Sequence, residues 1–340
     1  MRILLVKLSS LGDVVHAMPV VHDILQAHPG ALIDWVVEPA FAPLVRRVHG
    51  INAVIECSLR RWIPAWWKAE VRAEWRAFRL RLGAVKYDAV IDLQGLTKSA
   101  VVARLAHGVS YGMANATEGS SFEAPARWLI DQPIRMPLHV HAVDRARQLV
   151  AAALKFELQG LPQYGLAAQA TREQGNPSAA TKPVMLFVHG TSRDDKLWPE
   201  AHWIAVGQRL AAAGWRIALP RAGDVERARA HRIAAAILAA GGTANGAASG
   251  FKAEVWPAMN LNALTERMQS CQAVIGVDSG LSHIAVALSL PHVQIYNLPT
   301  AWRTGPQATL EQPHMLAVEG TPTPSLEAVW AAWQRVAPAT

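Results

Sequence analysis

Cysteine is scarce in this sequence, which has only Cys57 and Cys271 among 340 residues. The two are far apart and match no metal-ligand spacing, which disfavours a disulfide scaffold and a zinc module. No apolar run approaches the roughly 20 residues that cross a bilayer. Lys7 and the polar residues after it interrupt the N-terminal apolar run too early for a signal peptide. We therefore expect a cytoplasmic chain that at most lies on a membrane surface.

Acidic residues and several ligand-binding motifs are also under-represented. Asp and Glu total 26 against 33 Lys and Arg, which gives a net charge of +7 and favours acidic partners without requiring nucleic acid. The sequence has no G-x-G-x-x-G after a strand, no G-x-x-x-x-G-K-[ST], no H-E-x-x-H and no D-x-D pair. We therefore expect no metal and no bound cofactor.

What the sequence does have is a regular alternation of short apolar runs and helical patterns, with 51% hydrophobic residues. Such alternation predicts parallel sheets built from βαβ units, and the length predicts two domains. The predicted strands are 2–7, 32–37, 53–56, 87–93, 184–189, 215–219, 273–277 and 292–296. The predicted helices of the second half are 199–213, 224–240, 261–270 and 281–288. The fold class is α/β, with two doubly wound domains that bind ligands at the carboxyl ends of their strands.

The domain boundary is predicted at a change in composition. Residues 161–182 are rich in Gly, Pro, Gln and Thr and form a linker between domains 1–160 and 183–340. The Ala- and Gly-rich segment 239–250 is predicted to be a loop. The segment 324–336 has apolar residues at helical spacing and should dock on one of the domains, with the N-terminal domain as one option.

Asp13 is a candidate catalytic base. It follows the first strand in the segment Ser9-Ser10-Leu11-Gly12-Asp13, where Gly12 allows a ligand to approach closely. A carboxylate there can accept a proton from an attacking sugar hydroxyl. The alternative, which position alone does not exclude, is that Asp13 is only a helix N-cap.

Two segments of the second domain are candidate anion sites. The first follows strand 184–189, where Thr191, Ser192 and Lys196 can hold a diphosphate; a solvated loop with capping hydroxyls is the alternative. The second is 278–283, where free amides at a helix start can bind an anion and His283 can donate to it. Taken alone, a single histidine is more often structural.

Residues 60–81 form a strongly basic segment, with seven basic and two acidic residues. Lys68, Arg72, Arg76 and Arg79 share one helical face, and the neighbouring face holds an apolar stripe of Trp67, Val71, Trp75 and Phe78. This pattern suits an anionic lipid or a phosphorylated glycolipid. An ordinary surface helix with an aromatic core face is the alternative, and both can hold together.

Seven blocks occur in the order MRILLVKLSSLGDVVHAMP, LRRW, YDAVIDLQGLTKSA, RLAHGVSYGM, HAVDR, FVHGTSRDDKLWPEAHW and VIGVDSGLSHIAVAL. As an ordered set they closely resemble the lipopolysaccharide heptosyltransferases of glycosyltransferase family 9, and the DKLWP block resembles the type I branch. The resemblance runs from Met1 to about Tyr296. Two departures from the family pattern are Ile63-Pro64 after Trp62, and the segment 114–119, which has no arginine.

The resemblance implies a GT-B fold and an inverting, metal-independent transfer of L-glycero-D-manno-heptose. The donor would be ADP-heptose, and the acceptor a 3-deoxy-D-manno-octulosonic acid residue of lipid A at the cytoplasmic face of the inner membrane. By that resemblance Asp13 is the general base. The implied donor-binding residues are Thr191, Ser192, Lys196, Glu226, Met259, Asp278, Ser279, Gly280 and His283, and the implied acceptor-binding residues are Ser10, Gly12, Arg60, Arg61, Gln94 and Lys98. The alternatives are a GT-B transferase with another nucleotide-sugar donor and a non-catalytic peripheral membrane adaptor.

Overall fold

The computed structural model describes residues 1–166, 182–241, 252–307 and 312–338. The chain divides into two compact units, Met1–Ala167 and Ala168–Thr340. The division falls inside the segment that the composition predicts to be a linker. The predicted loop 239–250 lies almost wholly outside the described residues.

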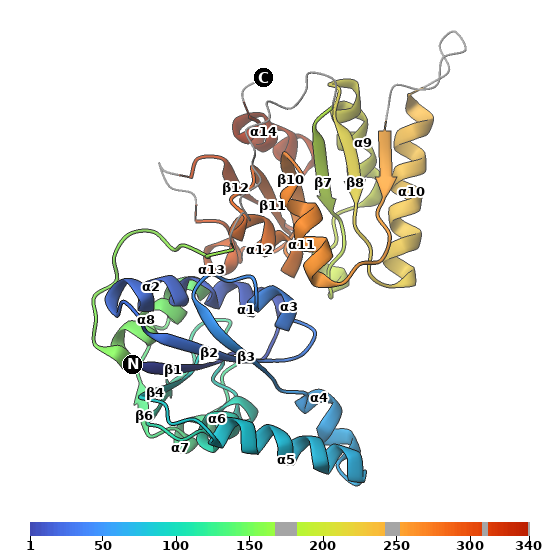
Figure 1. Cartoon of the computed structure of the whole chain (residues 1–340). Helices are drawn as coiled ribbons and strands as arrows, with labels where there is room; N and C mark the ends of the chain where they lie inside the picture. Colours follow the sequence, from blue (N-terminus) through green and yellow to red (C-terminus); the bar gives the residue numbers. More distant parts are fainter. Residues whose placement is uncertain (167–181, 242–251, 308–311, 339–340) are drawn as a thin grey trace. The chain divides into compact units, whose positions relative to one another are not determined.

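The first unit is built on a sheet of six parallel strands in the order β3-β2-β1-β4-β5-β6 (Figure 1). The strands are β1 (Arg2–Val6), β2 (Leu32–Val37), β3 (Ile51–Glu56), β4 (Ala89–Asp92), β5 (Ser110–Met113) and β6 (Gln132–Ile134). The first four lie where the apolar runs predict them. β5 and β6 were not predicted because they are short and carry Gly and Pro.

Helices cover both faces of this sheet, as a doubly wound fold requires. They are α1 (Leu11–Ala17), α2 (Pro19–Ala27), α3 (Ala42–Val45), α4 (Leu59–Trp62), η1 (Ile63–Ala65), α5 (Ala69–Gly83), α6 (Thr97–Leu105), α7 (Ala126–Leu129) and α8 (Ala142–Leu154). α5 and α6 share one core with Leu4, Val6 and Val90 of the sheet. α8 packs on α1 and α2, and the buried Arg147 in α8 makes a two-pronged ion pair with Asp23 in α2 at 2.8 and 2.9 Å.

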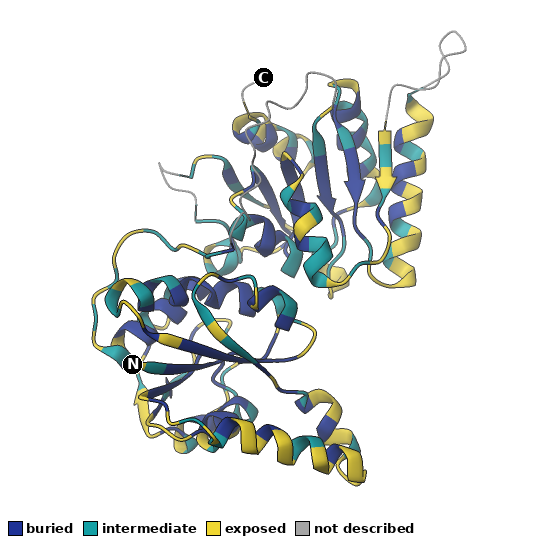
Figure 2. Cartoon of the chain, in the orientation of Figure 1, coloured by how far each residue is buried: buried dark blue, intermediate teal, exposed yellow. Residues whose placement is uncertain are grey.

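The basic segment differs from its prediction at its start. Helix α5 begins at Ala69, so both Trp67 and Lys68 lie before the helix, and Trp67 is 71% exposed instead of joining the apolar stripe. Val71 and Phe78 are buried as predicted. The remainder of α5 is largely exposed (Figure 2).

The second unit repeats the same topology, with the strand order β9-β8-β7-β10-β11-β12. Its strands are β7 (Val184–Val188), β8 (Arg216–Leu219), β9 (Lys252–Val255), β10 (Ala273–Val277), β11 (His292–Tyr296) and β12 (Met315–Glu319). Its helices are η2 (Asp194–Lys196), α9 (Glu200–Ala212), α10 (Asp224–Ala240), α11 (Leu261–Gln269), α12 (Gly280–Ala287), α13 (Ala301–Thr304) and α14 (Leu326–Val336). The edge strands β9 and β12 were not predicted from the sequence.

The C-terminal helix α14 belongs to the second unit. Val329, Trp333 and Val336 are buried in the core that α9, α10 and the sheet share, and Trp333 packs edge-on against Trp215. The option that this face packs on the N-terminal domain is therefore wrong. The apolar spacing gave the right helix but could not tell which sheet it would cover.

The strand order reverses its direction between β1 and β4 in the first unit and between β7 and β10 in the second. In open α/β sheets, ligands bind outside the carboxyl ends of the strands at this point. Asp13 follows β1, and Asp278 follows β10. Each unit therefore places predicted functional residues where its own fold favours a ligand.

Candidate active site

Asp13 occupies the third position of α1 in the first unit. The Ser10 amide and hydroxyl both donate to its Oδ2, each at 3.0 Å. The N-cap is Ser10, and Asp13 at the third position forms a capping box with it, so Asp13 helps to cap α1 without being the N-cap residue itself. The Asp13 side chain is 43% exposed. It is therefore held in one orientation while remaining accessible to a ligand.

The groups around Asp13 favour its ionised form. Lys7 lies directly after β1, is buried, and places its Nζ 3.9 Å from Asp13 Oδ1 and 3.2 Å from the Leu93 carbonyl. Burial alone would raise the pKa of Asp13, but Lys7, the Ser10 hydrogen bonds and Arg145 of α8 together lower it. Asp13 is thus a carboxylate at neutral pH, the state that a proton acceptor needs.

Gln94 positions the loop that leads to Asp13. Its side-chain oxygen accepts hydrogen bonds from the amides of Leu8 at 2.8 Å and Ser9 at 3.3 Å. The side chain is buried. That Gln94 contacts the acceptor remains a prediction, and the structure shows that its side chain also positions the loop before Asp13.

Asp92 at the end of β4 is a second buried carboxyl beside this site. Its oxygens accept from the amide of Gln94 at 2.9 Å and from the Ser99 hydroxyl at 3.0 Å. Burial outweighs these bonds and the charge of Lys7 and raises the pKa of Asp92 to about 6. The folded state therefore holds a proton that an unfolded aspartate releases at lower pH.

This shift predicts a pH dependence of stability. Between the ordinary pKa of 3.8 and about 6, the unfolded chain binds fewer protons at this site than the folded chain. The free energy of unfolding should therefore fall as pH rises through this range, by up to about 3 kcal/mol from Asp92. Asp92→Asn should remove that part of the slope in urea denaturation between about pH 4 and 8. An unchanged slope in the variant would contradict the assignment.

The predicted acceptor-binding cations separate into two groups. Arg60 donates from Nε to Glu38 at 3.1 Å, and Lys98 in α6 acts on the same buried carboxylate. Burial raises the pKa of Glu38, and these two cations oppose the shift. Arg61 instead pairs with Glu74 of α5. The structure brings Arg60 and Lys98 together through Glu38 and directs Arg61 toward α5.

In the second unit, the loop after β7 meets the residue after β10. Lys196 at the end of η2 donates from Nζ to Asp278 Oδ2 at 2.6 Å, and its side chain is 22% exposed. The Thr191 hydroxyl donates to the Asp278 backbone carbonyl at 3.1 Å. Ser192, the next residue, is exposed. Predicted residues that are 82 or more positions apart in sequence thus converge on Asp278.

The start of α12 completes this cluster. His283 Nε2 lies 3.5 Å from Asp278 Oδ1. Burial would raise the pKa of Asp278, but His283 and Lys196 lower it well below its ordinary value. Ser279 caps α12 immediately before Gly280, and its buried Oγ has no hydrogen-bond partner among the described residues. A cation, a helix N-terminus and an unpartnered buried hydroxyl together suit a phosphate ligand.

Glu226 and Met259 lie at the same edge of the second sheet. Glu226 is in the first turn of α10, which follows β8, and Met259 is in the loop after β9. The Glu226 Oε2 accepts from the Ala222 amide at 2.8 Å, and burial raises the pKa of this carboxyl. A Cβ on Gly190 would lie 1.9 Å from Glu226 Oε1, so a side chain at this position would displace the Glu226 carboxylate.

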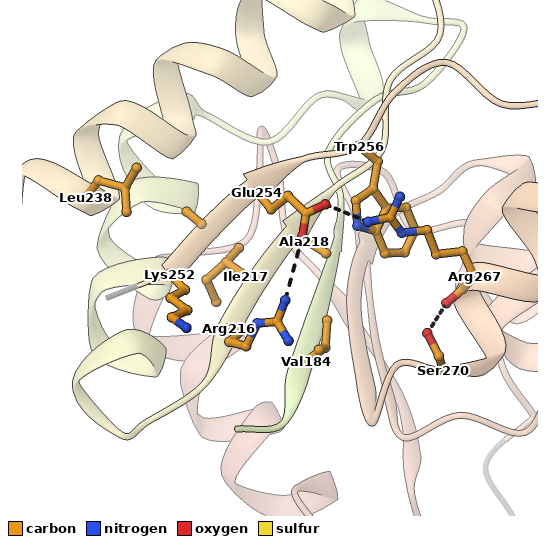
Figure 3. Close-up of a pocket in the computed structure, with 11 residues that line it drawn as sticks. Val184, Arg216, Ile217, Ala218, Leu238, Lys252, Glu254, Trp256, Arg267 and Ser270 are labelled. Carbon is orange, nitrogen blue, oxygen red and sulfur yellow. Dashed lines mark hydrogen bonds and ion pairs between the residues drawn. The ribbon is translucent and has the colours of Figure 1, made fainter. Parts of the chain in front are cut away.

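A cavity of the second unit lies elsewhere. It has a volume of about 380 Å³ and reaches the first residues of β7, β8 and β9, which are Val184, Arg216 and Lys252 (Figure 3). Arg216 and Arg267 both already contact Glu254 there, at 3.7 and 2.5 Å. Because these ends of the strands are opposite the switch point, the cavity is separate from the candidate site.

Sequence reasoning missed four charged residues that shape the first site: Lys7, Glu38, Asp92 and Arg145. Lys7 and Asp92 end apolar strands, and this position is the signal that could have identified them.

Within the described ranges, no three His, Cys, Asp or Glu side chains are grouped so that they could hold a metal ion. No helix in the same ranges is both long and apolar enough to cross a membrane.

Two doubly wound units, each with charged residues at its switch point, form the arrangement of the GT-B fold, which two-domain glycosyltransferases use. The family model "Glycosyltransferase family 9 (heptosyltransferase)" matches residues 75–327. The lipopolysaccharide heptosyltransferases 1 of Escherichia coli K12 and Salmonella typhimurium are 40% and 38% identical, each over 87% of this chain and 88% of the relative. The solved structure of E. coli heptosyltransferase WaaC with ADP has 35% identity and a TM-score of 0.82, and covers 98% of both chains.

The chain therefore belongs to glycosyltransferase family 9, the heptosyltransferases. This confirms the family and the GT-B fold class that the ordered sequence blocks predict. By comparison, the lipopolysaccharide heptosyltransferase 2 of E. coli K12 is 26% identical over 87% of this chain. The chain is thus more similar to the type 1 relatives of E. coli and Salmonella than to this type 2 relative, as the DKLWP block predicts.

Proposed function

We propose that this chain transfers L-glycero-D-manno-heptose from ADP-heptose to a 3-deoxy-D-manno-octulosonic acid residue of lipid A, with inversion at the sugar carbon. The type 1 relatives carry lipopolysaccharide heptosyltransferase in their names. A further E. coli WaaC structure, with ADP-2-deoxy-2-fluoro heptose, has 34% identity and a TM-score of 0.77 to this chain. The observation that carries the proposal is the convergence of Lys196, Asp278, His283 and the unpartnered Ser279 hydroxyl at one switch point.

The second unit would bind the donor. Lys196 and the free amides at the start of α12 would hold the diphosphate, with Thr191, Ser192, Gly280 and His283 around it. Glu226 would contact the adenosine ribose, and Met259 the adenine. The same cation and amides would stabilise the charge that develops on departing ADP, which makes the proposed reaction independent of metal and cofactor.

The first unit would bind the acceptor and supply the base. Asp13, ionised beside Lys7, would take the proton of the acceptor hydroxyl as its oxygen attacks the heptose anomeric carbon. The bond from that carbon to the ADP oxygen breaks as the new glycosidic bond forms, and ADP leaves with the electron pair. Ser10, Gly12, Gln94 and Lys98 would surround the acceptor sugar, and Arg60 and Arg61 would meet its anionic groups.

A donor comparison tests this proposal. We expect calorimetric titration to detect ADP-heptose binding, and the acceptor lipid to gain the mass of one heptose in the presence of a chelator. ADP-glucose and UDP-sugars should give little or no product, because the proposed adenine and heptose contacts would be lost. Equal or faster turnover with another nucleotide sugar would contradict the donor assignment.

We also propose that the chain works at the cytoplasmic face of the inner membrane, in contact with an anionic lipid surface. A lipid-linked acceptor requires the enzyme to reach the membrane surface. The basic and aromatic composition of residues 60–81 supports such a contact.

A further inference from the structure

A short exposed apolar segment lies between α4 and α5 in the first unit. Ile63, Trp66 and Trp67 are 65%, 49% and 71% exposed. They lie within five residues, on η1 and the turn that follows it (Figure 1). Three large apolar side chains exposed together are unusual on a water-soluble surface and indicate a binding partner.

The turn is held from beneath by an aromatic cluster. Trp62 is buried and packs against Trp75 and Phe78, with ring centroids 5.7 and 5.4 Å apart, and its indole nitrogen donates to Glu74. The Arg72 guanidinium donates to the carbonyls of Trp66 and Trp67. The exposed side chains therefore project from an ordered base, and their exposure is built into the local fold.

Basic residues flank this turn in the sequence. Arg60 and Arg61 precede it, and Lys68, Arg72, Arg76 and Arg79 follow it, all of them exposed. Three of these six cations pair with the carboxylates of Glu38, Glu74 and Glu70, and an excess of positive charge remains over residues 60–81. Tryptophan favours the interface between lipid headgroups and acyl chains, and each nearby cation adds attraction to anionic lipid. A patch of a few residues is too small for a stable protein interface, which needs about 800 Å² from each partner. Exposed apolar side chains flanked by an excess of basic residues match a lipid surface.

We infer that residues 63–67 form a docking tip that inserts Ile63 and Trp67 into the headgroup region of an anionic membrane. The Trp66 ring packs edge-on against Trp75 of the aromatic cluster, with ring centroids 6.1 Å apart, and supports the tip. The inference deepens the proposed membrane contact by naming the inserting residues. Binding of the tip to a lipid vesicle requires no heptose transfer, so it can be tested separately.

Cosedimentation with vesicles provides the test. Phosphatidylcholine vesicles with and without phosphatidylglycerol would be compared for the full chain, the double variant Ile63→Gln/Trp67→Gln and the control Trp128→Gln. Trp128 is also 71% exposed and beside an arginine, but α7, which carries it, lies at the other end of α5 from η1 (Figure 1). We expect the double variant to lose roughly tenfold in partition into anionic vesicles, with the control close to wild type.

Two outcomes would overturn the inference that residues 63–67 form a docking tip. One is wild-type partition of the double variant, and the other is an equal loss with Trp128→Gln. Binding of the wild type should also weaken with salt and require phosphatidylglycerol, and a salt-independent association would contradict a role of the flanking basic residues.

A turnover assay on a deacylated, water-soluble acceptor separates this inference from the proposed function. We expect the double variant to equal wild type there and to be slower only on vesicle-embedded acceptor. Equal slowing on both acceptors would overturn a membrane role for the tip. Failure of the wild type on both acceptors would contradict the proposed function, while the vesicle partition would still decide the tip.

Discussion

Asp13→Asn should lower turnover by about 10²- to 10⁴-fold, the usual contribution of a positioned general base. Asparagine has nearly the same shape and retains a side-chain oxygen that can accept from the Ser10 amide and hydroxyl. It cannot take up the proton of the attacking hydroxyl. The measurement is the turnover number at saturating donor and acceptor, with donor affinity followed by calorimetry.

The Asp13→Asn variant separates two roles of Asp13, which are to accept the substrate proton and to accept the hydrogen bonds from Ser10 at the start of α1. If Asp13 serves only the local fold of α1, Asn should show near wild-type turnover, because it keeps the hydrogen bonds from Ser10. Donor affinity should be unchanged, since the donor cluster belongs to the second unit. Asp13→Ala removes both roles, and loss of the hydrogen bonds from Ser10 should also destabilise the chain by about 1 kcal/mol. Near wild-type turnover of Asp13→Asn would exclude it as the base.

Much of the fold follows from the sequence because buried parallel strands are nearly continuous apolar runs. β10 and β11 have the predicted ends, and so does α10. The short edge strands β6 and β9 read differently, as Gln-Pro-Ile and as Lys-Ala-Glu-Val. Four of these seven residues are polar or break strands, and only pairing with a neighbour makes them strands. Short strands with few apolar residues are therefore the ones that the sequence pattern does not predict.

The candidate site was predictable where a segment follows an apolar strand. This rule located Asp13, Thr191 and Asp278, because the carboxyl ends of parallel strands share one edge. It could not pair Lys196 with Asp278, since 82 residues separate them and only the strand order brings them together. Nor could it find Arg145 of α8, whose charge lowers the pKa of Asp13 and whose helix is fixed by packing on α1 and α2. The strand order and the packing of helices therefore decide which charged residues become electrostatic partners, and local sequence patterns do not show this.

Lys196→Ala should reduce kcat/KM by about 10²- to 10³-fold, through weaker donor binding and a slower transfer step. Lys196 now pairs with Asp278 at 2.6 Å and is only 22% exposed, so its charge acts in partly desolvated surroundings where it is poorly screened. A bound diphosphate would offer this ammonium a stronger anionic partner, both before and during departure of ADP.

Arg193→Ala is the matched control for Lys196→Ala. Arg193 is a cation on the same loop, but its side chain is 60% exposed and paired with Asp195. Its removal should change kcat/KM by less than about threefold, because an exposed ion pair contributes little. Steady-state kinetics over a range of ADP-heptose concentrations separates the two effects of Lys196. If Lys196→Ala raised KM alone and kept wild-type turnover at saturating donor, Lys196 would hold the ground-state diphosphate but would not stabilise the leaving group.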